Sequence, residues 1–273
     1  MNKFQNILIC TDLDGTLLKN DKTISRENLD AIRYFQSEGG CFTFVTGRMP
    51  YFVTEMYKRV HPNAPVGCIN GGGLYDFAVG KYLWTQTMPH SVLELVKYAD
   101  ESIENLGVQV NLFDRILFCH DNDATADFRS ATGVPHLVSC YDAIDEPIAK
   151  IVFCDNDEKH IERLSRLLHD HPRADEFDFI RSERSLYEIL PRGIHKGVAL
   201  PKLAELLGID MNRTIAVGDY NNDIGMLRAA GIGIAVENAC PEAKAAADYI
   251  TVSNENHAIA RIIEDIESGA LGI

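Results

Sequence analysis

Two aspartates separated by one residue open the segment Asp12-Leu13-Asp14-Gly15-Thr16-Leu17-Leu18, directly after an apolar run typical of a buried strand. Ligands of open α/β sheets bind beyond the carboxyl ends of the strands, so a site is expected here. One carboxylate can attack phosphorus and form an aspartyl phosphate, while the other moves protons for the leaving group and then for water. Alone, such a pair is more often a solvated turn.

Three further segments carry residues that suit phosphate or a metal ion. Thr46 and Gly47 follow a second predicted strand, where a hydroxyl and backbone N–H groups can bind phosphate oxygens. Lys196 opens a predicted helix, a position that the helix dipole disfavours for a cation unless an anion binds beside it. Asp219 and Asp223 follow another predicted strand, and paired carboxylates there suit Mg²⁺. Each signal is weak alone, and the set indicates a phosphate site.

Short apolar runs alternate with amphipathic segments, which predicts an α/β fold with a mostly parallel sheet. Strands are expected at 6–11, 41–46, 66–69, 214–218, 232–236 and 249–252. Helices are expected between the cap Ser25 and Gly39, and near 196–207, 223–230, 241–247 and 258–266.

The middle of the chain has a different pattern, typical of an α+β domain. Helices are expected at 91–106 and 157–169, and strands at 108–113, 116–119, 149–154, 177–180 and 186–190. The junctions are expected near 81–89 and 191–195. We therefore predict a discontinuous core domain of residues 1–83 and 192–273, with an inserted domain of residues 84–191.

The ordered motifs DLDGTLL, VTGR, Lys196 and GDYNND resemble the four motifs of the haloacid dehalogenase superfamily of phosphohydrolases, over essentially the whole chain. NGG after the third strand, EILP followed by HKG, and NACPEAKAAADY are similar to the Cof-type subfamily in particular. The sequence departs from that subfamily at Asn254-Glu255-Asn256-His257, where members often carry Asp-Gly after Asn-Glu.

The resemblance implies a role for each motif residue. Asp12 would be the nucleophile and Asp14 the general acid and base. The metal, Mg²⁺, would be held by Asp12, the backbone carbonyl of Asp14 and Asp219, with Asp223 beside it or bound through water. The phosphate would be bound by Thr46, Lys196 and Asn222, and by the backbone at Leu13 and Gly47. Mg²⁺ and Lys196 would offset the repulsion between the attacking carboxylate and the phosphate dianion.

The spacing of the motifs locates the insertion. Asp12 and Thr46 are 34 positions apart (46 − 12), which leaves room for one helix and one strand, whereas Thr46 and Lys196 are 150 apart (196 − 46). Within the family this resembles a C2-type cap, which covers the site and selects the substrate. The expected fold is a doubly wound, Rossmann-like parallel sheet with an inserted α+β cap. A cap that closes would keep bulk water out.

The formal net charge of −14 and the pI near 5.0 disfavour nucleic acid and anionic membranes as partners. No signal peptide or membrane-spanning stretch is evident, and the seven scattered cysteines form no CxxC pair, so a cytoplasmic protein with reduced thiols is expected. A monomer is the default expectation, and the sequence also allows a homodimer.

These observations predict a Mg²⁺-dependent phosphatase that hydrolyses a small phosphomonoester: a sugar phosphate, a phosphorylated cofactor or a nucleotide. Two alternatives remain open from the sequence. One is a phosphomutase of the same fold, which would return the phosphate to a rotated substrate. The other is a non-catalytic sensor of a phosphorylated ligand, although the complete set of motif residues argues against it.

Overall fold

A computed structural model describes residues 2–273, which form two compact units. Unit 1 consists of the two outer segments, up to Thr85 and from His195 onward, and unit 2 is Gln86–Ile194. The sequence-based junction at 83/84 falls inside a strand, β5 (Lys81–Thr85). The other, at 191/192, coincides with the end of β11 (Leu186–Pro191). Residues 81–85 were expected to lie at the junction. They belong instead to a small sheet of unit 1.

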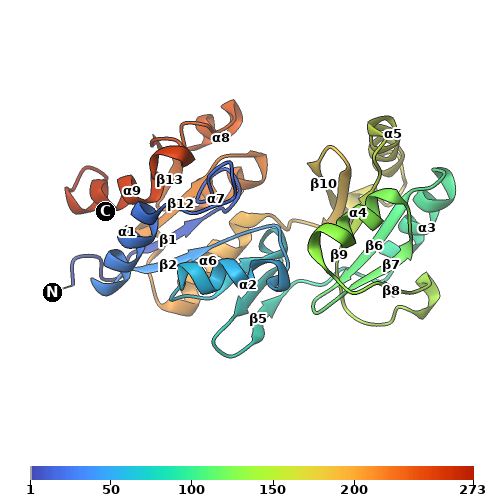
Figure 1. The fold of residues 1–273 in the computed structure, drawn as a ribbon, viewed down its shortest axis with the longest axis horizontal. Helices are drawn as coiled ribbons and strands as arrows, with labels where there is room; N and C mark the ends of the chain where they lie inside the picture. The colour runs from blue at the N-terminus through green and yellow to red at the C-terminus, as the bar shows by residue number, and fades with distance from the viewer. Residues whose placement is uncertain (1) are drawn as a thin grey trace. The chain divides into compact units, whose positions relative to one another are not determined.

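Unit 1 is built on a parallel sheet of five strands in the order β14-β13-β12-β1-β2 (Figure 1). The strands are β1 (Leu8–Thr11), β2 (Cys41–Phe44), β12 (Thr214–Gly218), β13 (Ile232–Ala235) and β14 (Tyr249–Ile250). The chain proceeds from β1 to one side and from β12 to the other, so the switch point of the sheet lies between these two strands. The predicted parallel α/β core is confirmed.

The helices of unit 1 are α1 (Arg26–Ser37), α2 (Pro50–Val60), α6 (Lys196–Leu207), α7 (Ile224–Ala229), α8 (Pro241–Ala246) and α9 (Ala258–Glu267). The hydroxyl of Ser25 accepts a hydrogen bond from the Asn28 N–H and caps α1, as predicted. Gly208, in the left-handed conformation, ends α6. Helix α1 packs against α9, and α6 packs against α7.

A second, antiparallel sheet of unit 1 was not predicted from the sequence. It consists of β3 (Val66–Cys68), β4 (Gly73–Asp76) and β5, and a parallel bridge between Val45 and Gly67 joins it to the end of β2. Helix α2 was also missed. Its apolar residues are interspersed with aromatic and charged ones, and Pro50 at its first position resembles a turn signal as much as a helix start.

Unit 2 contains a six-stranded sheet in the order β10-β11-β9-β6-β7-β8. The strands are β6 (Gly107–Leu112), β7 (Ile116–His120), β8 (Leu137–Val138), β9 (Ile148–Cys154), β10 (Phe177–Glu183) and β11. The helices are α3 (Val92–Ser102), α4 (Asp123–Thr132) and α5 (Glu158–His169). Sequence analysis missed β8 and α4, because the residues around Asp121 are polar and show no apolar helical pattern; Asn122 caps α4.

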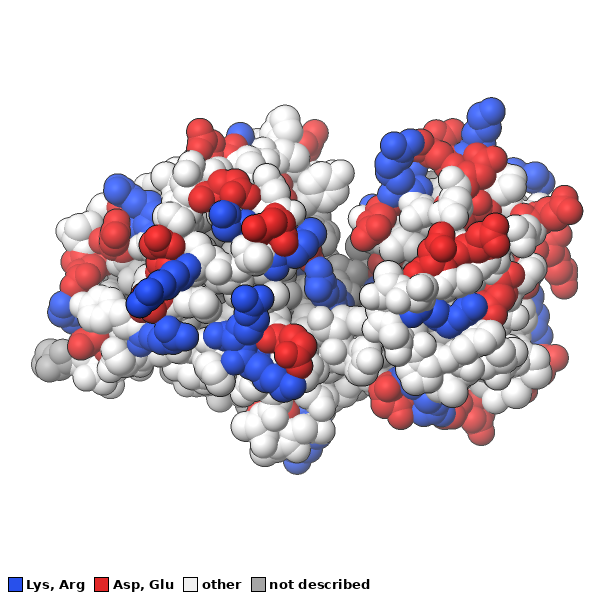
Figure 2. Space-filling model, in the orientation of Figure 1, with Lys and Arg blue, Asp and Glu red and all other residues white. Residues whose placement is uncertain are grey.

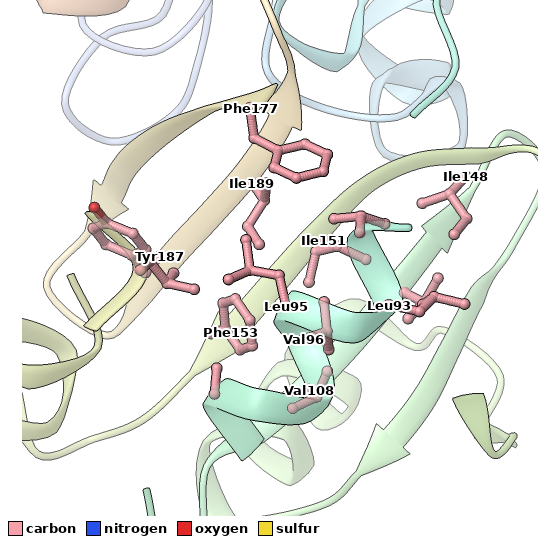
Figure 3. Packing of buried hydrophobic residues seen from close by; sticks show 14 of the residues in the cluster. Leu93, Leu95, Val96, Val108, Ile148, Ile151, Phe153, Phe177, Tyr187 and Ile189 are labelled. Carbon is pink, nitrogen blue, oxygen red and sulfur yellow. The ribbon is translucent and has the colours of Figure 1, made fainter. Parts of the chain in front are cut away.

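The core of unit 2 lies between one face of this sheet and its helices (Figure 3). Side chains alternate between the two faces of a strand, so residues two apart share a face. The core face carries Val108 and Val110 of β6, Ile151 and Phe153 of β9, and Tyr187 and Ile189 of β11, which pack with Leu95, Val96 and Leu164. The residues between them in these strands lie on the second face.

On the face shown in Figure 2, acidic and basic side chains are interspersed rather than gathered into one large patch of a single sign. No helix within residues 2–273 is both long enough and apolar enough to cross a membrane. All seven cysteines are free.

Candidate active site

The candidate site forms where parallel strands of unit 1 end side by side. Residues Leu8–Thr11 of β1 pair in parallel register with Thr214–Val217 of β12 on one side and with Cys41–Phe44 of β2 on the other. The segments that follow these strands therefore start at one edge of the sheet, at its switch point. Asp12 continues this register, because its N–H donates to the carbonyl of Val217. This is the edge at which open α/β sheets bind ligands.

Lys196 lies between two carboxylates at the centre of this edge. Its Nζ is 2.5 Å from Oδ1 of Asp12 and 2.6 Å from Oδ1 of Asp223. All three side chains are buried, with exposed fractions of 2% for Lys196, 6% for Asp12 and 0% for Asp223. Helix α6 begins at Lys196, where its dipole opposes a cation, and the two carboxylates compensate. The sequence predicted an anion beside Lys196, and the carboxylates of Asp12 and Asp223 provide it within the protein itself.

Asp223 also closes the turn that carries Asp219. Its second oxygen, Oδ2, accepts hydrogen bonds from the backbone N–H groups of Asp219 and Tyr220, both at 3.0 Å. Because one oxygen binds Lys196 and the other binds the turn, this carboxylate is already well supplied with donors. Its geometry suits a positioning role better than direct binding of a metal.

Asp219 is held by residues of the first motif. The hydroxyl of Thr16 donates to its Oδ1 at 2.8 Å. Gly15 approaches the same carboxylate so closely that a Cβ atom on this residue would lie 2.5 Å from Oδ2 of Asp219. Gly15 also has a φ of +83°, in the left-handed region. The glycine is therefore required both by its backbone conformation and by the space that Asp219 occupies.

We predict that Gly15→Ala destabilises the protein by roughly 2–3 kcal/mol, because it adds a steric overlap with Asp219 to the backbone strain. The matched control is Gly80→Ala. Gly80 has a φ of +70° but no atom within 4 Å of the added Cβ, so that variant should cost only about 1 kcal/mol of strain. Thermal unfolding of both variants measures the difference, and equal losses would show that contact with Asp219 contributes nothing.

Asp12, Asp219 and Asp223 each offer an oxygen within 4.8 Å of the others, a group that could hold a metal ion. Burial raises the pKa of Asp12 to about 8, with Asp223 and Asp219 adding to the rise against the lowering effect of Lys196. Burial likewise raises the pKa of Asp219 to about 6. When ionised, the three carboxylates outnumber the single ammonium of Lys196, so negative charge is in excess at this point. Oxygen ligands of this kind suit Mg²⁺, which takes few protein carboxylates together with water or phosphate oxygens.

The side chain of Asp14 points to different partners from those of Asp12. Both its oxygens accept from Nη2 of Arg48, at 2.9 and 2.8 Å, and Oδ1 also accepts from Nζ of Lys22 at 2.9 Å. Partial burial opposes ionisation of Asp14, but Arg48 and Lys22 outweigh it and lower its pKa. Arg48, the last residue of the VTGR motif, thus forms an ion pair with Asp14.

The residues expected to bind phosphate lie around the same edge. Thr46 is buried, and its hydroxyl accepts from the N–H of Arg48 at 3.2 Å. Gly47 lies next to Asn70: a Cβ atom there would be 2.9 Å from Oδ1 of Asn70. Within residues 2–273, the N–H of Leu13 finds no hydrogen-bond acceptor, and the same holds for the half-buried side chain of Asn222 in the turn Asn221–Asp223. The N–H of Leu13 and the side-chain amide of Asn222 can therefore donate hydrogen bonds to phosphate oxygens.

A tight turn after β3 adds a feature that the sequence did not reveal. Ile69, Asn70 and Gly71 all have positive φ, of 54°, 51° and 89°. Such a conformation is costly for a β-branched residue, and strained backbone of this kind concentrates at functional sites. The Asn70 N–H donates to the carbonyl of Thr46 at 3.0 Å, so the turn is fixed beside the second motif.

Sequence analysis missed the supporting roles of Thr16, Lys22 and Asn238. Thr16 holds Asp219, Lys22 holds Asp14, and Asn238 donates from Nδ2 to the Gly15 carbonyl at 2.8 Å. Thr16 stands inside the first motif and could have been singled out. Asn238 opens the segment NACPEAKAAADY, but nothing in that segment indicates a contact with Gly15. Lys22 belongs to a loop without any pattern, and only the fold brings both residues to the site.

A model of the haloacid dehalogenase-like hydrolases matches residues 9–263 of the chain. The protein belongs to this family. The span contains all four motifs, the whole of unit 2 and most of unit 1, so the resemblance inferred from the sequence, to phosphohydrolases of the Cof type, is confirmed.

Relatives of this haloacid dehalogenase-like hydrolase support the same conclusion. Two are the 5-amino-6-(5-phospho-D-ribitylamino)uracil phosphatases YitU and YwtE of Bacillus subtilis strain 168. YitU is 29% identical over 263 residues, which cover 94% of this chain and 96% of YitU. YwtE is 28% identical over 286 residues, covering 96% and 98%.

Solved structures show the same fold. A haloacid dehalogenase-like hydrolase from Bacteroides thetaiotaomicron has a TM-score of 0.82 at 25% identity, covering 95% of this chain and 99% of that one. A protein from Thermotoga maritima has a TM-score of 0.83 at 24% identity, covering 94% and 96%. The predictions of the fold class and of an enzyme of the phosphatase class are confirmed.

Proposed function

We propose that this haloacid dehalogenase-like hydrolase is a Mg²⁺-dependent phosphatase of small phosphomonoesters that forms an aspartyl phosphate on Asp12. The observation that carries the proposal is the buried contact of Lys196 with both Asp12 and Asp223, with Asp219 beside them. This arrangement supports a carboxylate nucleophile, a fixed cation and an acidic metal site at one strand edge.

In the first step an oxygen of Asp12 attacks phosphorus, and the bond from phosphorus to the leaving oxygen breaks. Lys196 holds the Asp12 carboxylate in place and offsets the charge of the approaching phosphate. Bound Mg²⁺, held by Asp12, Asp219 and the backbone carbonyl of Asp14, would neutralise negative charge on the phosphate oxygens. Thr46, Asn222 and the backbone at Leu13 and Gly47 bind those oxygens and orient the group.

Asp14 moves the protons. It donates a proton to the leaving oxygen in the first step and accepts one from the water that attacks phosphorus in the second, when the bond to Asp12 breaks. To donate, Asp14 must first carry a proton, which its ion pairs with Arg48 and Lys22 oppose. We propose that these contacts hold Asp14 in an ionised resting state and loosen when substrate binds.

The class of substrate rests on the site and on relatives. Two relatives are named for a phosphorylated ribitylamino-uracil. We propose a small phosphorylated metabolite as the partner, with a sugar phosphate, a phosphorylated cofactor or a nucleotide as candidates. We also propose that the protein acts as a cytoplasmic monomer, without nucleic acid or membrane partners.

We predict that Mg²⁺ stabilises the folded protein by relieving repulsion among the clustered carboxylates. At a Mg²⁺ concentration about 100 times its Kd, the gain should be about 2.7 kcal/mol, seen as a rise in the melting temperature. Asp219→Asn should remove most of this rise, whereas Asp30→Asn, on the exposed face of α1, should leave it unchanged. An equal rise in wild type and Asp219→Asn would contradict a metal site at Asp219.

The proposed function is tested by phosphate release from a panel of small phosphomonoesters, with and without Mg²⁺. We expect release that requires Mg²⁺, with a ranking that begins to define the substrate. Isomerisation of a substrate without free phosphate, dependent on a bisphosphate activator, would support the phosphomutase instead. Binding of phosphorylated ligands without either reaction would support the sensor.

A further inference from the structure

Two strands of the unit 1 sheet, β13 and β14, end at the catalytic edge without supplying a residue to the proposed mechanism. Strand β13 is parallel to β12, and β14 is parallel to β13, so the segments that follow them start at the same edge as Asp219. Each of these segments carries an asparagine, Asn238 after β13 and Asn254 after β14. Both asparagines contact the loop that follows the two aspartates of the first motif.

Asn238 joins three separate parts of the chain. Its Nδ2 donates to the carbonyl of Gly15 at 2.8 Å, and its Oδ1 accepts from the N–H of Asn254 at 2.9 Å. The side chain therefore uses both ends of its amide, one toward the loop after β1 and the other toward the segment after β14. A change at either asparagine alters the support of the other.

Asn254 is enclosed, with an exposed fraction of 2%. Its Nδ2 donates to the carbonyl of Leu18 at 2.9 Å and to Oδ1 of Asn20 at 3.3 Å. Buried polar groups need hydrogen-bond partners, and this amide takes both acceptors from a loop more than 230 positions away in the sequence. The neighbouring Glu255 accepts from the N–H of Asn20 at 2.7 Å, so the far end of the same loop is also held.

The loop that these bonds hold returns to Asp14. Leu18 forms a parallel bridge with Asp14, and its N–H donates to the carbonyl of Leu13 at 2.8 Å. The position of Leu18 therefore determines the position of the Asp14 backbone. The carboxylate of Asp14 has its hydrogen bonds from Arg48 and Lys22, among the residues that the structure describes. If these bonds loosen when substrate binds, the backbone must fix where the carboxyl group lies.

We propose that Asn238 and Asn254, here called the asparagine pair, are positioning residues for proton transfer by Asp14. The inference rests on the proposed phosphatase function and adds to it two residues that none of the four motifs contains. A general acid must lie within hydrogen-bond reach of the leaving oxygen. A displacement of about 1 Å can cost on the order of 100-fold in rate, so a loop that carries the acid must be held firmly.

Two aryl phosphates separate this role from a merely structural one. Phenyl phosphate and p-nitrophenyl phosphate share the ring and the phosphate, but their leaving oxygens differ in basicity. Phenolate, with a pKa of about 10 as in tyrosine, needs a proton to leave, whereas the nitro group stabilises the anion of p-nitrophenol, which departs readily without one. General distortion of the site would slow both substrates alike. Displacement of Asp14 slows phenyl phosphate more.

The experiment measures kcat/KM for both substrates with Mg²⁺ present. Asn238→Ala and Asn254→Ala should each lower kcat/KM for phenyl phosphate roughly tenfold and that for p-nitrophenyl phosphate by less than about threefold. Because the two side chains act as one unit, the double variant should lose little more than either single variant, instead of the roughly 100-fold expected from independent residues. Asp14→Asn is the reference and should show the same selectivity with a larger loss.

Asn256→Ala is the matched control. Asn256 lies two residues beyond Asn254, and its Nδ2 donates to Oγ of Ser253 at 3.1 Å, within its own segment. This variant should leave both substrates unchanged. Thermal unfolding is measured for every variant, because Asn254→Ala opens a buried position. Asn238 is exposed, so Asn238→Ala carries the test on a folded protein.

Equal losses for the two substrates in Asn238→Ala, no loss for either, or losses that multiply in the double variant would overturn the asparagine pair. With Asp14→Asn still selective, the phosphatase function would stand in each of these cases. Asp14→Asn without selectivity would instead contradict Asp14 as the general acid. Wild type that releases phosphate from neither substrate, with or without Mg²⁺, would contradict the proposed function on which the inference rests.

Discussion

Asp12→Asn should reduce phosphate release on the order of 10⁴-fold or more while leaving the protein folded. The amide keeps the size of the side chain but cannot attack phosphorus, and loss of a nucleophile removes a whole reaction path rather than a single contact. Lys196 keeps its contact with Asp223, so the cation stays paired. Steady-state phosphate release, with circular dichroism to check folding, measures the effect.

A control variant and a limit on residual activity define the outcome of this test. Asp30→Asn, the same substitution on the exposed face of α1, should retain full activity. Residual activity above about a hundredth of the wild-type rate in folded Asp12→Asn would contradict the assignment of the nucleophile, since no other carboxylate of the site occupies its position.

Lys196→Met should abolish activity and, in metal-free buffer, lower the free energy of unfolding by about 3 kcal/mol. Removal of one partner from a buried ion pair leaves uncompensated charge, here on both Asp12 and Asp223. Mg²⁺ should restore part of the lost stability, because it supplies positive charge at the same carboxylates, but not the activity. Thermal unfolding with and without Mg²⁺, together with phosphate release, measures both effects.

Lys202→Met is the matched control, on the same helix. Lys202 lies over the ring of Trp84, 4.2 Å from its centroid, and forms no ion pair within the described part of the chain. Its loss should cost less than about 1 kcal/mol and leave activity intact. A Lys196→Met variant as stable as Lys202→Met would show that the buried charges of the site do not depend on Lys196.

The sequence predicted which residues meet at this edge of the sheet, because motifs such as the first and the fourth follow strands with a strong apolar signal. Strands β1 and β12 end within a residue of Asp12 and Asp219, and parallel strands of one sheet end at the same edge. The start of α6 at Lys196 also agrees with the prediction, because the apolar spacing of that helix is regular. Apolar patterns of this kind are local, so they can be recognised in a single sequence.

Features that depend on tertiary contact were not predictable. The contact of Lys22 with Asp14 joins a motif to an unpatterned loop, and the strained turn Ile69–Gly71 depends on its packing beside Thr46. Helix α4 was missed because its first turn is polar, and only the hydrogen bonds of Asn122 reveal the cap. The buried ion pair of Lys150 with Glu188 joins β9 to β11, and its two members become neighbours only when the strand register is known.

The most direct test of the central claim is to trap the phosphoryl group on the protein. Wild type is mixed with a rapidly hydrolysed phosphomonoester and Mg²⁺, quenched in acid within one turnover, digested and examined by mass spectrometry. We predict one phosphoryl group on the peptide that contains Asp12, at Asp12 itself, and none in Asp12→Asn. Full-rate phosphate release with the group on another residue, or with no phosphorylated peptide at any time of quenching, would contradict a covalent mechanism at Asp12.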